Sequence, residues 1–204
     1  MSKKIKHLHK YFYAGFHLTC IGDSRQYSII ESKFKNSYSD KIAKLILKYK
    51  KGNTKIYSFF DRGSDERQYN SPGVNLSVVT LMRSRFGSFK EYHSSMDNLN
   101  ITSEKTLIDS FNYVFDIVKL IQNDFLISTS IKCEPFLSKR NLYRNTGLTD
   151  PWNENENLMF DLLSYADNIR LSELAIKLNK NPFKLIELVK FFKKKGLLKI
   201  NLKK

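Results

Sequence analysis

The pattern of apolar and polar positions in the first two thirds of the chain predicts alternating strands and helices. Strand-like runs are continuous in apolar residues or rich in β-branched and aromatic side chains. Helical segments instead repeat their apolar residues at intervals of three and four. The pattern predicts strands at residues 12–21, 55–60, 77–82 and 125–131, and helices at residues 39–50 and onward from a cap at Thr102 or Ser103. Such alternation is typical of an α/β layered domain.

The pattern changes at about Glu154, where three short amphipathic helices begin. They are predicted at residues 156–166, at residues 171–178 and from the Asn181-Pro182 pair to Gly196, with a strand at residues 197–200. Asparagine followed by proline is a common helix start, and glycine a common stop. Three helices and a terminal strand predict a winged helix-turn-helix. We therefore predict an α/β domain over residues 1–133, a linker over 134–153 and a winged helix-turn-helix domain over 154–204.

Composition sets limits on this organisation. The chain has 204 residues, of which 41% are hydrophobic and 13% aromatic, so it can build a packed core. No apolar run reaches membrane-spanning length, and no membrane partner is expected. Cys20 and Cys133 lie far apart without a spacing motif, which indicates a reducing, cytoplasmic setting. The net charge is +15, but lysine, asparagine and isoleucine are all frequent, as AT-rich codon usage would make them. We therefore give the overall charge little weight.

Two polar segments are candidates for chemistry. The loop Asp61–Gly73 lies between two predicted strands and is dense in charge. Binding groups are often held on such loops, but a solvated connection has the same composition. Asp23 follows the first strand, where open α/β sheets place ligand-binding groups. It is equally suited to capping the next turn, and the residues alone leave both alternatives open.

Three motifs, taken together, resemble a known family. Residues 20–23 (Cys-Ile-Gly-Asp), residues 61–69 (Asp-Arg-Gly-Ser-Asp-Glu-Arg-Gln-Tyr) and residues 91–97 (Glu-Tyr-His-Ser-Ser-Met-Asp) occur in that order. The chain resembles the carboxyl-terminal half of zinc-aminopeptidase-like proteins that end in a winged-helix domain. The resemblance implies part of a three-layer α/β sandwich of the di-zinc aminopeptidase clan. In that clan, two zinc ions polarise the scissile carbonyl and activate a bridging water.

The resemblance also implies roles for individual residues. Asp23 and His93 match zinc ligands, since a carboxylate and a neutral imidazole are suitable donors. The charged loop would form the wall of a pocket for a peptide or an amino-acid amide. Its residues Asp65, Glu66, Arg67 and Tyr69 would contact substrate. The residues do not decide whether Asp65 or Glu66 would bind the substrate amine.

The chain also departs from the family pattern. The family's first metal-binding histidine, its bridging aspartate and its catalytic glutamate pair lie in an amino-terminal half that has no counterpart in this sequence. We therefore expect no catalytic residue in this chain and an incomplete zinc site. By itself the chain is expected to be an inactive, truncated part of the enzyme. A separately encoded amino-terminal half could complete it, and homo-oligomers are possible.

An alternative function is a nucleic-acid-binding or oligomerisation module that acts through the winged helix. The second and third helices carry a cluster of lysines, which are suited to phosphate contacts. These are Lys177, Lys180, Lys184, Lys190, Lys193, Lys194 and Lys195. Base readout, however, needs arginine, asparagine or glutamine on the recognition helix, and this helix offers mainly lysine, leucine and phenylalanine. Nucleic acid is therefore not the partner we expect.

Overall fold

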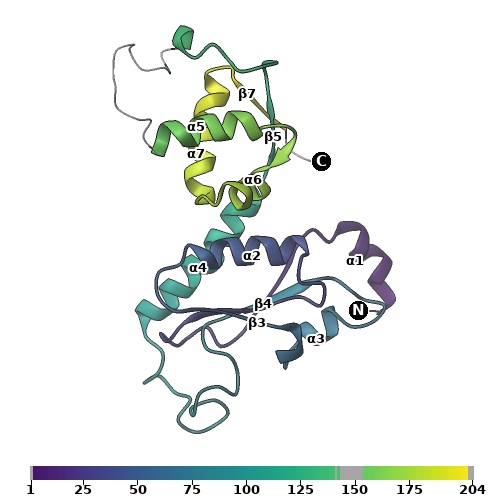
Figure 1. The fold of residues 1–204 in the computed structure, drawn as a ribbon. Helices are drawn as coiled ribbons and strands as arrows, with labels where there is room; N and C mark the ends of the chain where they lie inside the picture. Colours follow the sequence, from purple (N-terminus) through teal and green to yellow (C-terminus); the bar gives the residue numbers. More distant parts are fainter. Residues whose placement is uncertain (1, 141, 143–153, 202–204) are drawn as a thin grey trace. The chain divides into compact units, whose positions relative to one another are not determined.

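The computed structural model describes residues 2–140, 142 and 154–201. The chain divides into two compact units, Met1–Lys119 and Leu120–Lys204 (Figure 1). Each unit has its own sheet and its own helices. Among the described residues, no helix is long and apolar enough to cross a membrane.

A four-stranded mixed sheet forms the centre of the first unit. Its strands are β1 (Gly15–Leu18), β2 (Tyr27–Ile30), β3 (Thr54–Tyr57) and β4 (Val78–Met82), in the spatial order β1-β4-β2-β3. β1 runs parallel to β4, β2 runs parallel to β3, and β2 and β4 are antiparallel. All five residues of β4 are buried. Its sequence, apolar except for Thr80, fits this central position, since both faces of the strand are covered.

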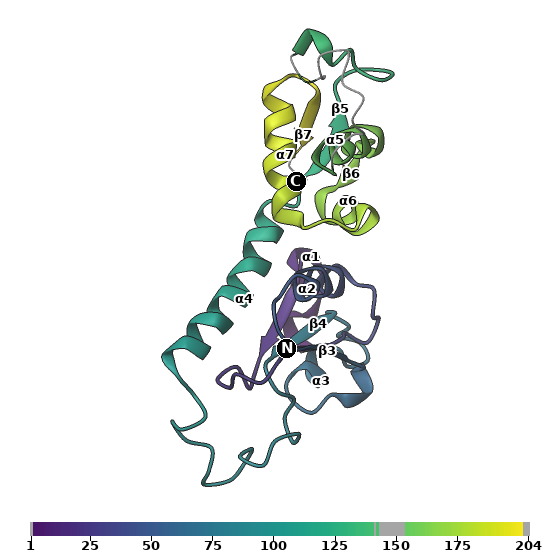
Figure 2. The ribbon, with the colours of Figure 1, turned by 60° about the vertical axis from the view of Figure 1, so that its left-hand side comes forward.

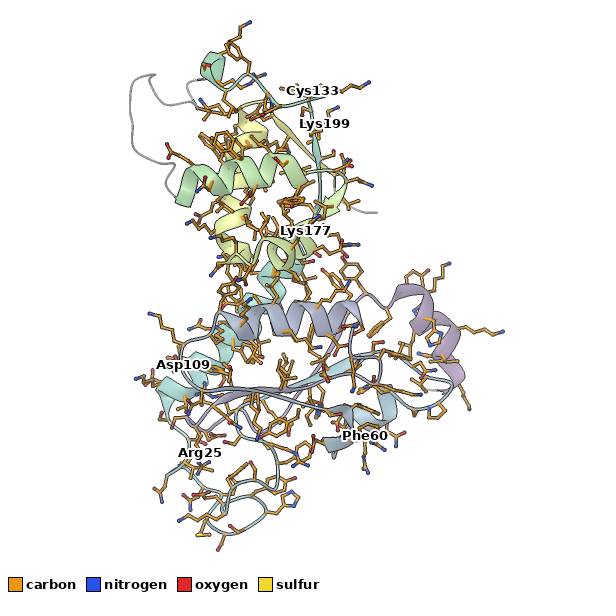
Figure 3. The ribbon with its side chains drawn as sticks, viewed as in Figure 1. Arg25, Phe60, Asp109, Cys133, Lys177 and Lys199 are labelled. Carbon is orange, nitrogen blue, oxygen red and sulfur yellow. The ribbon has the colours of Figure 1, made fainter. Side chains whose placement is uncertain are left out.

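Helices cover both faces of this sheet. In Figures 1 and 2, α2 (Tyr38–Lys48) lies over one face, and the short α3 (Glu66–Tyr69) lies on the other. The unit also contains α1 (Ile5–Tyr11), two 3₁₀ turns at Ser2–Lys4 and Phe59–Asp61, and most of α4 (Glu104–Gln122). In the second of these turns the Phe60 side chain is 85% exposed (Figure 3). The core lies between the sheet and α2, where Ile29, Ile42, Ile46 and Leu81 are fully or almost fully buried.

α2 begins at a complete capping box. Ser37 accepts a hydrogen bond from the Asp40 backbone N–H, and the Asp40 carboxylate accepts one from the Ser37 backbone N–H. Asp40 is fully buried, and it also accepts from the Ser32 N–H at 2.8 Å and from the Ser32 hydroxyl. One carboxylate therefore holds both the start of the helix and the loop that leads into it. Reciprocal bonds of this kind satisfy the donors that a helix start leaves free.

In the described part of the second unit, a three-stranded sheet packs with three helices. The unit contains β5 (Leu126–Thr129), a 3₁₀ turn (Ser138–Arg140), α5 (Glu154–Tyr165), β6 (Ile169–Arg170), α6 (Leu171–Leu178), α7 (Pro182–Lys194) and β7 (Leu198–Asn201). The strand order is β6-β5-β7, with both pairs antiparallel. Figure 2 shows the helices gathered beside the sheet. This arrangement is the predicted winged helix-turn-helix.

Two polar contacts explain the local geometry of the winged helix. Asn181 accepts a hydrogen bond from the Phe183 N–H at 2.9 Å and caps α7, whose first residue is Pro182. Asp124 accepts from the Ser172 N–H at 2.7 Å and from the Ser172 hydroxyl at 3.0 Å, which joins the segment before β5 to the start of α6. The asparagine-proline start is therefore confirmed.

The strand predicted at residues 125–131 forms, but it belongs to the other unit. As β5, it pairs with β6 and β7 rather than with the sheet of the first unit. The division of the chain falls between Lys119 and Leu120, whereas we predicted that the first domain continues to residue 133. A strand of four residues carries no sign of which sheet it joins, so the sequence alone did not separate these outcomes. Most of the predicted linker, including Trp152, lies outside the described residues.

We predict that Asp40→Ala destabilises the first unit by about 3 kcal/mol, because it removes hydrogen bonds to a buried charge and leaves backbone donors without partners. Native-state hydrogen exchange of the α2 amides measures this loss. The exposed Asp65→Ala is the control and should stay within about 0.5 kcal/mol of the wild type. Equal exchange rates in the Asp40 variant and the wild type would contradict this account of the helix start.

Candidate functional site

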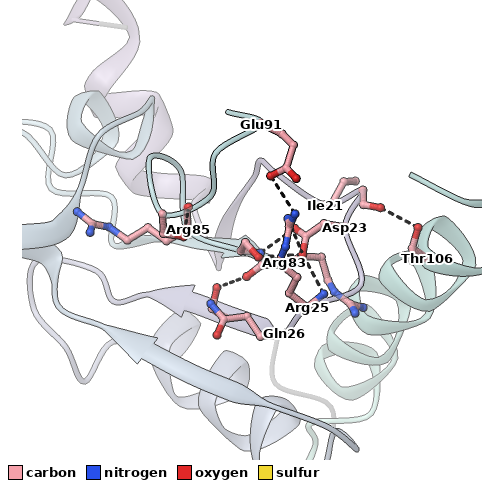
Figure 4. A network of polar contacts seen from close by, with 12 residues as sticks. Ile21, Asp23, Arg25, Gln26, Arg83, Arg85, Glu91 and Thr106 are labelled. Atoms are coloured by element: carbon pink, nitrogen blue, oxygen red, sulfur yellow. Dashed lines mark hydrogen bonds and ion pairs between the residues drawn. The ribbon is translucent and has the colours of Figure 1, made fainter. Parts of the chain in front are cut away.

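Asp23 lies in the segment that follows β1 and is only 5% exposed. Its Oδ1 accepts hydrogen bonds from the Arg25 N–H at 2.9 Å and from the Ser84 hydroxyl at 2.8 Å. Its Oδ2 accepts from the Ser84 N–H at 3.0 Å. Ser84 follows β4, so this carboxylate joins the carboxyl ends of two adjacent parallel strands (Figure 4). This position is compatible with both predicted roles of Asp23, binding a ligand and capping the next turn. An ionised carboxylate has about four acceptor sites, and three of them are used.

Arg25 extends the network to a third segment. Its Nη2 donates to Glu91 Oε2 at 2.9 Å, and its Nη1 lies 3.8 Å from Asp23 Oδ1. The guanidinium also lies over the Phe89 ring, 5.2 Å from its centroid. Glu91 is itself buried. These contacts hold the segment that carries His93 against the segment that carries Asp23.

The first half of α4 fixes the Asp23 segment from another side. The Thr106 hydroxyl donates to the Gly22 carbonyl at 2.7 Å, and the Ser110 hydroxyl donates to the Ile21 carbonyl at 2.6 Å. A Cβ at Gly22 would lie 2.6 Å from Thr102 Oγ1, so no other residue fits there without a shift. The glycine before Asp23 therefore permits close approach to Thr102 in the segment that precedes α4.

His93 is held in a different way. Its side chain is exposed, and its ring stacks on the Tyr92 ring with centroids 3.9 Å apart. Its φ of 55° is in the left-handed region. Across the described residues, no group of three or more His, Cys, Asp or Glu side chains is placed to hold a metal ion. Since zinc needs about three protein ligands, Asp23 and His93 do not form such a site by themselves.

The charged loop is organised by Glu66. This side chain is fully buried, and its Oε1 accepts hydrogen bonds from the Gly63 N–H at 2.7 Å and from the Ser64 N–H at 3.0 Å. Its Oε2 lies 3.5 Å from His17 Nδ1 on β1 and has no hydrogen-bond partner among the residues that the structure describes. We predicted a substrate contact for Glu66. In this structure its carboxylate is buried and holds the turn that carries the loop, and the substrate contact stays a prediction.

The other predicted residues of the loop are more accessible. Asp65 and Arg67 are exposed, and the Arg67 Nε donates to the Ser64 carbonyl at 3.3 Å. Tyr69 is partly buried, and its carbonyl accepts from the Leu76 N–H at 2.9 Å. Asp65, Arg67 and Tyr69 therefore remain available for the predicted substrate contacts.

The charged loop also approaches the segment after β4. A Cβ at Gly63 would lie 2.3 Å from the Phe86 ring, so the glycine permits close contact there. Asp61 Oδ1 lies 3.4 Å from the Arg85 Nη2. The predicted pocket wall and the Asp23 network therefore both contact residues 83–91.

Sequence reasoning missed three residues at the centre of this site. Ser84 binds Asp23, Arg85 pairs with Asp61, and Arg83 is a buried arginine with its guanidinium carbon 3.8 Å from the Tyr27 ring centroid. All three follow directly on β4. The argument applied to Asp23, that functional groups gather just past the carboxyl end of a buried strand, applied here too and could have found them.

Two family models match separate segments of this chain, and a solved structure matches 98% of it. Residues 1–124 match the family described as a domain of unknown function, DUF4910, and residues 124–200 match a winged helix-turn-helix family. A Clostridium acetobutylicum protein, provisionally named a polysaccharide biosynthesis protein with an aminopeptidase-like domain, is 37% identical over 154 residues. That alignment covers 75% of this chain and 35% of the relative.

A solved structure from the same organism, provisionally described as a peptidase, is also similar to this chain. Its TM-score is 0.84 at 31% identity, and the match covers 98% of this chain and 44% of that one. The chain therefore spans less than half the length of each protein. The α/β fold with a winged helix-turn-helix, predicted from sequence, is confirmed.

The two thiols should differ in reactivity. Burial, followed by the nearby carboxylates of Asp23 and Asp97, raises the pKa of the Cys20 thiol above its usual value. A raised pKa leaves less of the reactive thiolate at any pH near neutrality, and Cys133 is exposed. We expect Cys133 to be alkylated first at pH 8, with Cys20 labelled slowly and faster as the pH rises. Mass spectrometry of peptides measures both rates, and equal rates would contradict this account.

Glu66→Ala should loosen the charged loop, because the Gly63 and Ser64 N–H groups lose their acceptor. We expect a loss of about 3 kcal/mol in local stability, measured by hydrogen exchange of these two amides. Glu66→Gln keeps an acceptor oxygen and should lose less. The matched control is again the exposed neighbour, Asp65→Ala. Slow exchange of both amides in Glu66→Ala would show that another group orders the turn.

Proposed function

Because the chain belongs to the DUF4910 domain family and its relatives include aminopeptidase-like proteins, we propose that it contributes one part of a zinc-dependent aminopeptidase-like hydrolase. The single observation that carries this proposal is the match of 98% of the chain to the structure described as a peptidase, with a TM-score of 0.84. A match of this extent includes the Asp23 network and the charged loop. The activity is proposed for the complete fold, of which this chain is one part.

The proposed role of Asp23 is supported by its hydrogen bonds. Ser84 and Arg25 fix the carboxylate, and one acceptor site on Oδ2 is left for a metal. Groups that orient a metal-binding carboxylate in this way are a regular part of metal centres. His93 would supply an imidazole, and the remaining ligands would come from outside the described residues. Bound zinc would polarise the carbonyl of the substrate.

The proposed substrate is a peptide or an amino-acid amide. Asp65 and Arg67 are exposed on the charged loop, and Tyr69 lies beside them. An exposed carboxylate is suited to the amino group that an aminopeptidase must recognise. Glu66 would act indirectly, by holding the turn on which Asp65 is carried.

The outward face of α4 is apolar and exposed, which supports the proposal that this chain is one part of a larger fold. It carries Leu107, Ile108, Phe111, Phe115 and Val118, which are 43–66% exposed. The Phe111 and Phe115 rings stack on each other with centroids 5.8 Å apart. A continuous apolar stripe is unusual on a surface that stays in water. We propose that the remainder of the peptidase-like fold covers it, whether that remainder is joined to this chain or is a separate polypeptide.

A chimera tests this function. The present chain would replace the matched segment of the Clostridium acetobutylicum relative, and bound zinc and hydrolysis of amino-acid amides would be measured. We expect both to be present, and His93→Ala to lower zinc affinity and hydrolysis by more than about tenfold, since it removes a metal ligand.

His7→Ala is the matched control, because His7 is exposed on α1 and is expected to leave both measurements unchanged. A folded chimera with neither zinc nor hydrolysis would contradict the proposed function. Unchanged zinc affinity in His93→Ala would contradict the assignment of that ligand alone.

A further inference from the structure

A polar pocket of about 360 Å³ lies in the first unit between the Asp23 segment and the start of α4. Ser24, Arg83 and the segment before α4 contribute to its lining, together with Lys105, Thr106 and Asp109 of the helix. Figure 4 shows Arg83 among the side chains of the Asp23 network, with Thr106 of α4 alongside. The pocket is distinct from the charged loop, none of whose residues line it.

Arg83 is a buried cation that lines this pocket. It is only 4% exposed, and within the described part of the chain its Nε and Nη1 are buried without hydrogen-bond partners. In the same network, the Asp23 carboxylate accepts from Ser84 and the Glu91 carboxylate accepts from Arg25. The Tyr27 ring stabilises one face of the guanidinium but accepts none of its in-plane N–H groups. Burying such a cation is costly unless an anion or acceptor meets it.

The other wall of the pocket also favours an anion. α4 has 19 residues and begins at Glu104, so its first turn presents the positive end of the helix dipole. Ser103 accepts from the Thr106 N–H at 3.2 Å and thereby caps the helix. Lys105 is exposed in the first turn and adds a second positive charge. Helix starts with nearby cations commonly bind phosphate and carboxylate groups.

Asp109 restricts what the pocket can hold. It lies on α4 and lines the same pocket (Figure 3). Its negative charge disfavours a bare, highly charged anion. It favours a ligand whose anionic group meets Arg83 and whose hydroxyl or protonated oxygen donates to the aspartate.

We propose that this pocket binds the oxyanion group, carboxylate or phosphate, of a small ligand, with Arg83 as its principal contact and Lys105 and the start of α4 as supporting contacts. The geometry requires no metal and no activity of the complete hydrolase. The site can therefore be tested on the chain as it stands.

Nuclear magnetic resonance gives a direct test. The ¹⁵N-labelled chain is titrated with sodium phosphate and, separately, with sodium acetate, while sodium chloride keeps the ionic strength constant. We expect the Arg83 Nε–H and the backbone amides of Lys105 and Thr106 to shift and then saturate. Saturation by either anion supports the site, and the anion that binds more tightly identifies the group.

Variants distinguish a site from general ion effects. Arg83→Met should weaken binding at least tenfold, whereas Arg85→Met should leave it unchanged, because Arg85 pairs with Asp61 and does not line the pocket. If Arg83→Met does not fold, the same titrations are done with Lys105→Met and Asp109→Asn, whose side chains are more accessible. The first should weaken anion binding several-fold and the second should strengthen it. Shifts that never saturate, or a variant series in which Arg83 and Arg85 have equal effects, would overturn the proposal.

Discussion

The contact on which the first unit most depends is the Asp23 carboxylate between β1 and β4. Parallel strands leave their carboxyl ends without the short turn that joins antiparallel neighbours. Here the Ser84 N–H and hydroxyl bond to Asp23 at 3.0 and 2.8 Å and join the two ends. Arg25 and Glu91 then hold the segment before His93 to the same point. Every candidate residue of the site lies on a segment fixed directly or indirectly to this network.

Other buried acidic side chains are also held by hydrogen bonds from backbone N–H groups. Asp40, Glu66 and Asp124 are all buried, and each accepts hydrogen bonds from backbone N–H groups at a turn or helix start. Charged acceptors make stronger hydrogen bonds than neutral ones, which compensates for their burial. Acidic side chains are thus taken into the interior of a chain that has 35 lysines and arginines against 20 aspartates and glutamates. Arg83 is the exception, a buried cation that stacks on the Tyr27 ring and whose Nε and Nη1 have no hydrogen-bond partner among the described residues.

Long periodic segments were predictable, while short elements and indirect contacts were not. The helix at 39–50 forms as α2 over Tyr38–Lys48, because a full apolar stripe and a capping box act together. The central strand β2 was missed, because the four residues of Tyr27–Ile30 give no readable period. The burial of Glu66 could not be predicted, because a charge is visible in the sequence and the packing around it is not. Arg83 and Ser84 escaped notice, although their position after β4 gave the same signal as that of Asp23.

The central claim is that Asp23 holds the carboxyl ends of β1 and β4 together whether or not a metal is present. Hydrogen exchange of the metal-free chain tests it most directly, by comparing the wild type with Asp23→Ala and His93→Ala. The account predicts that Asp23→Ala loses protection at the Ser84 amide and along β1 and β4, while His93→Ala exchanges like the wild type. Full protection of these amides in Asp23→Ala would contradict it.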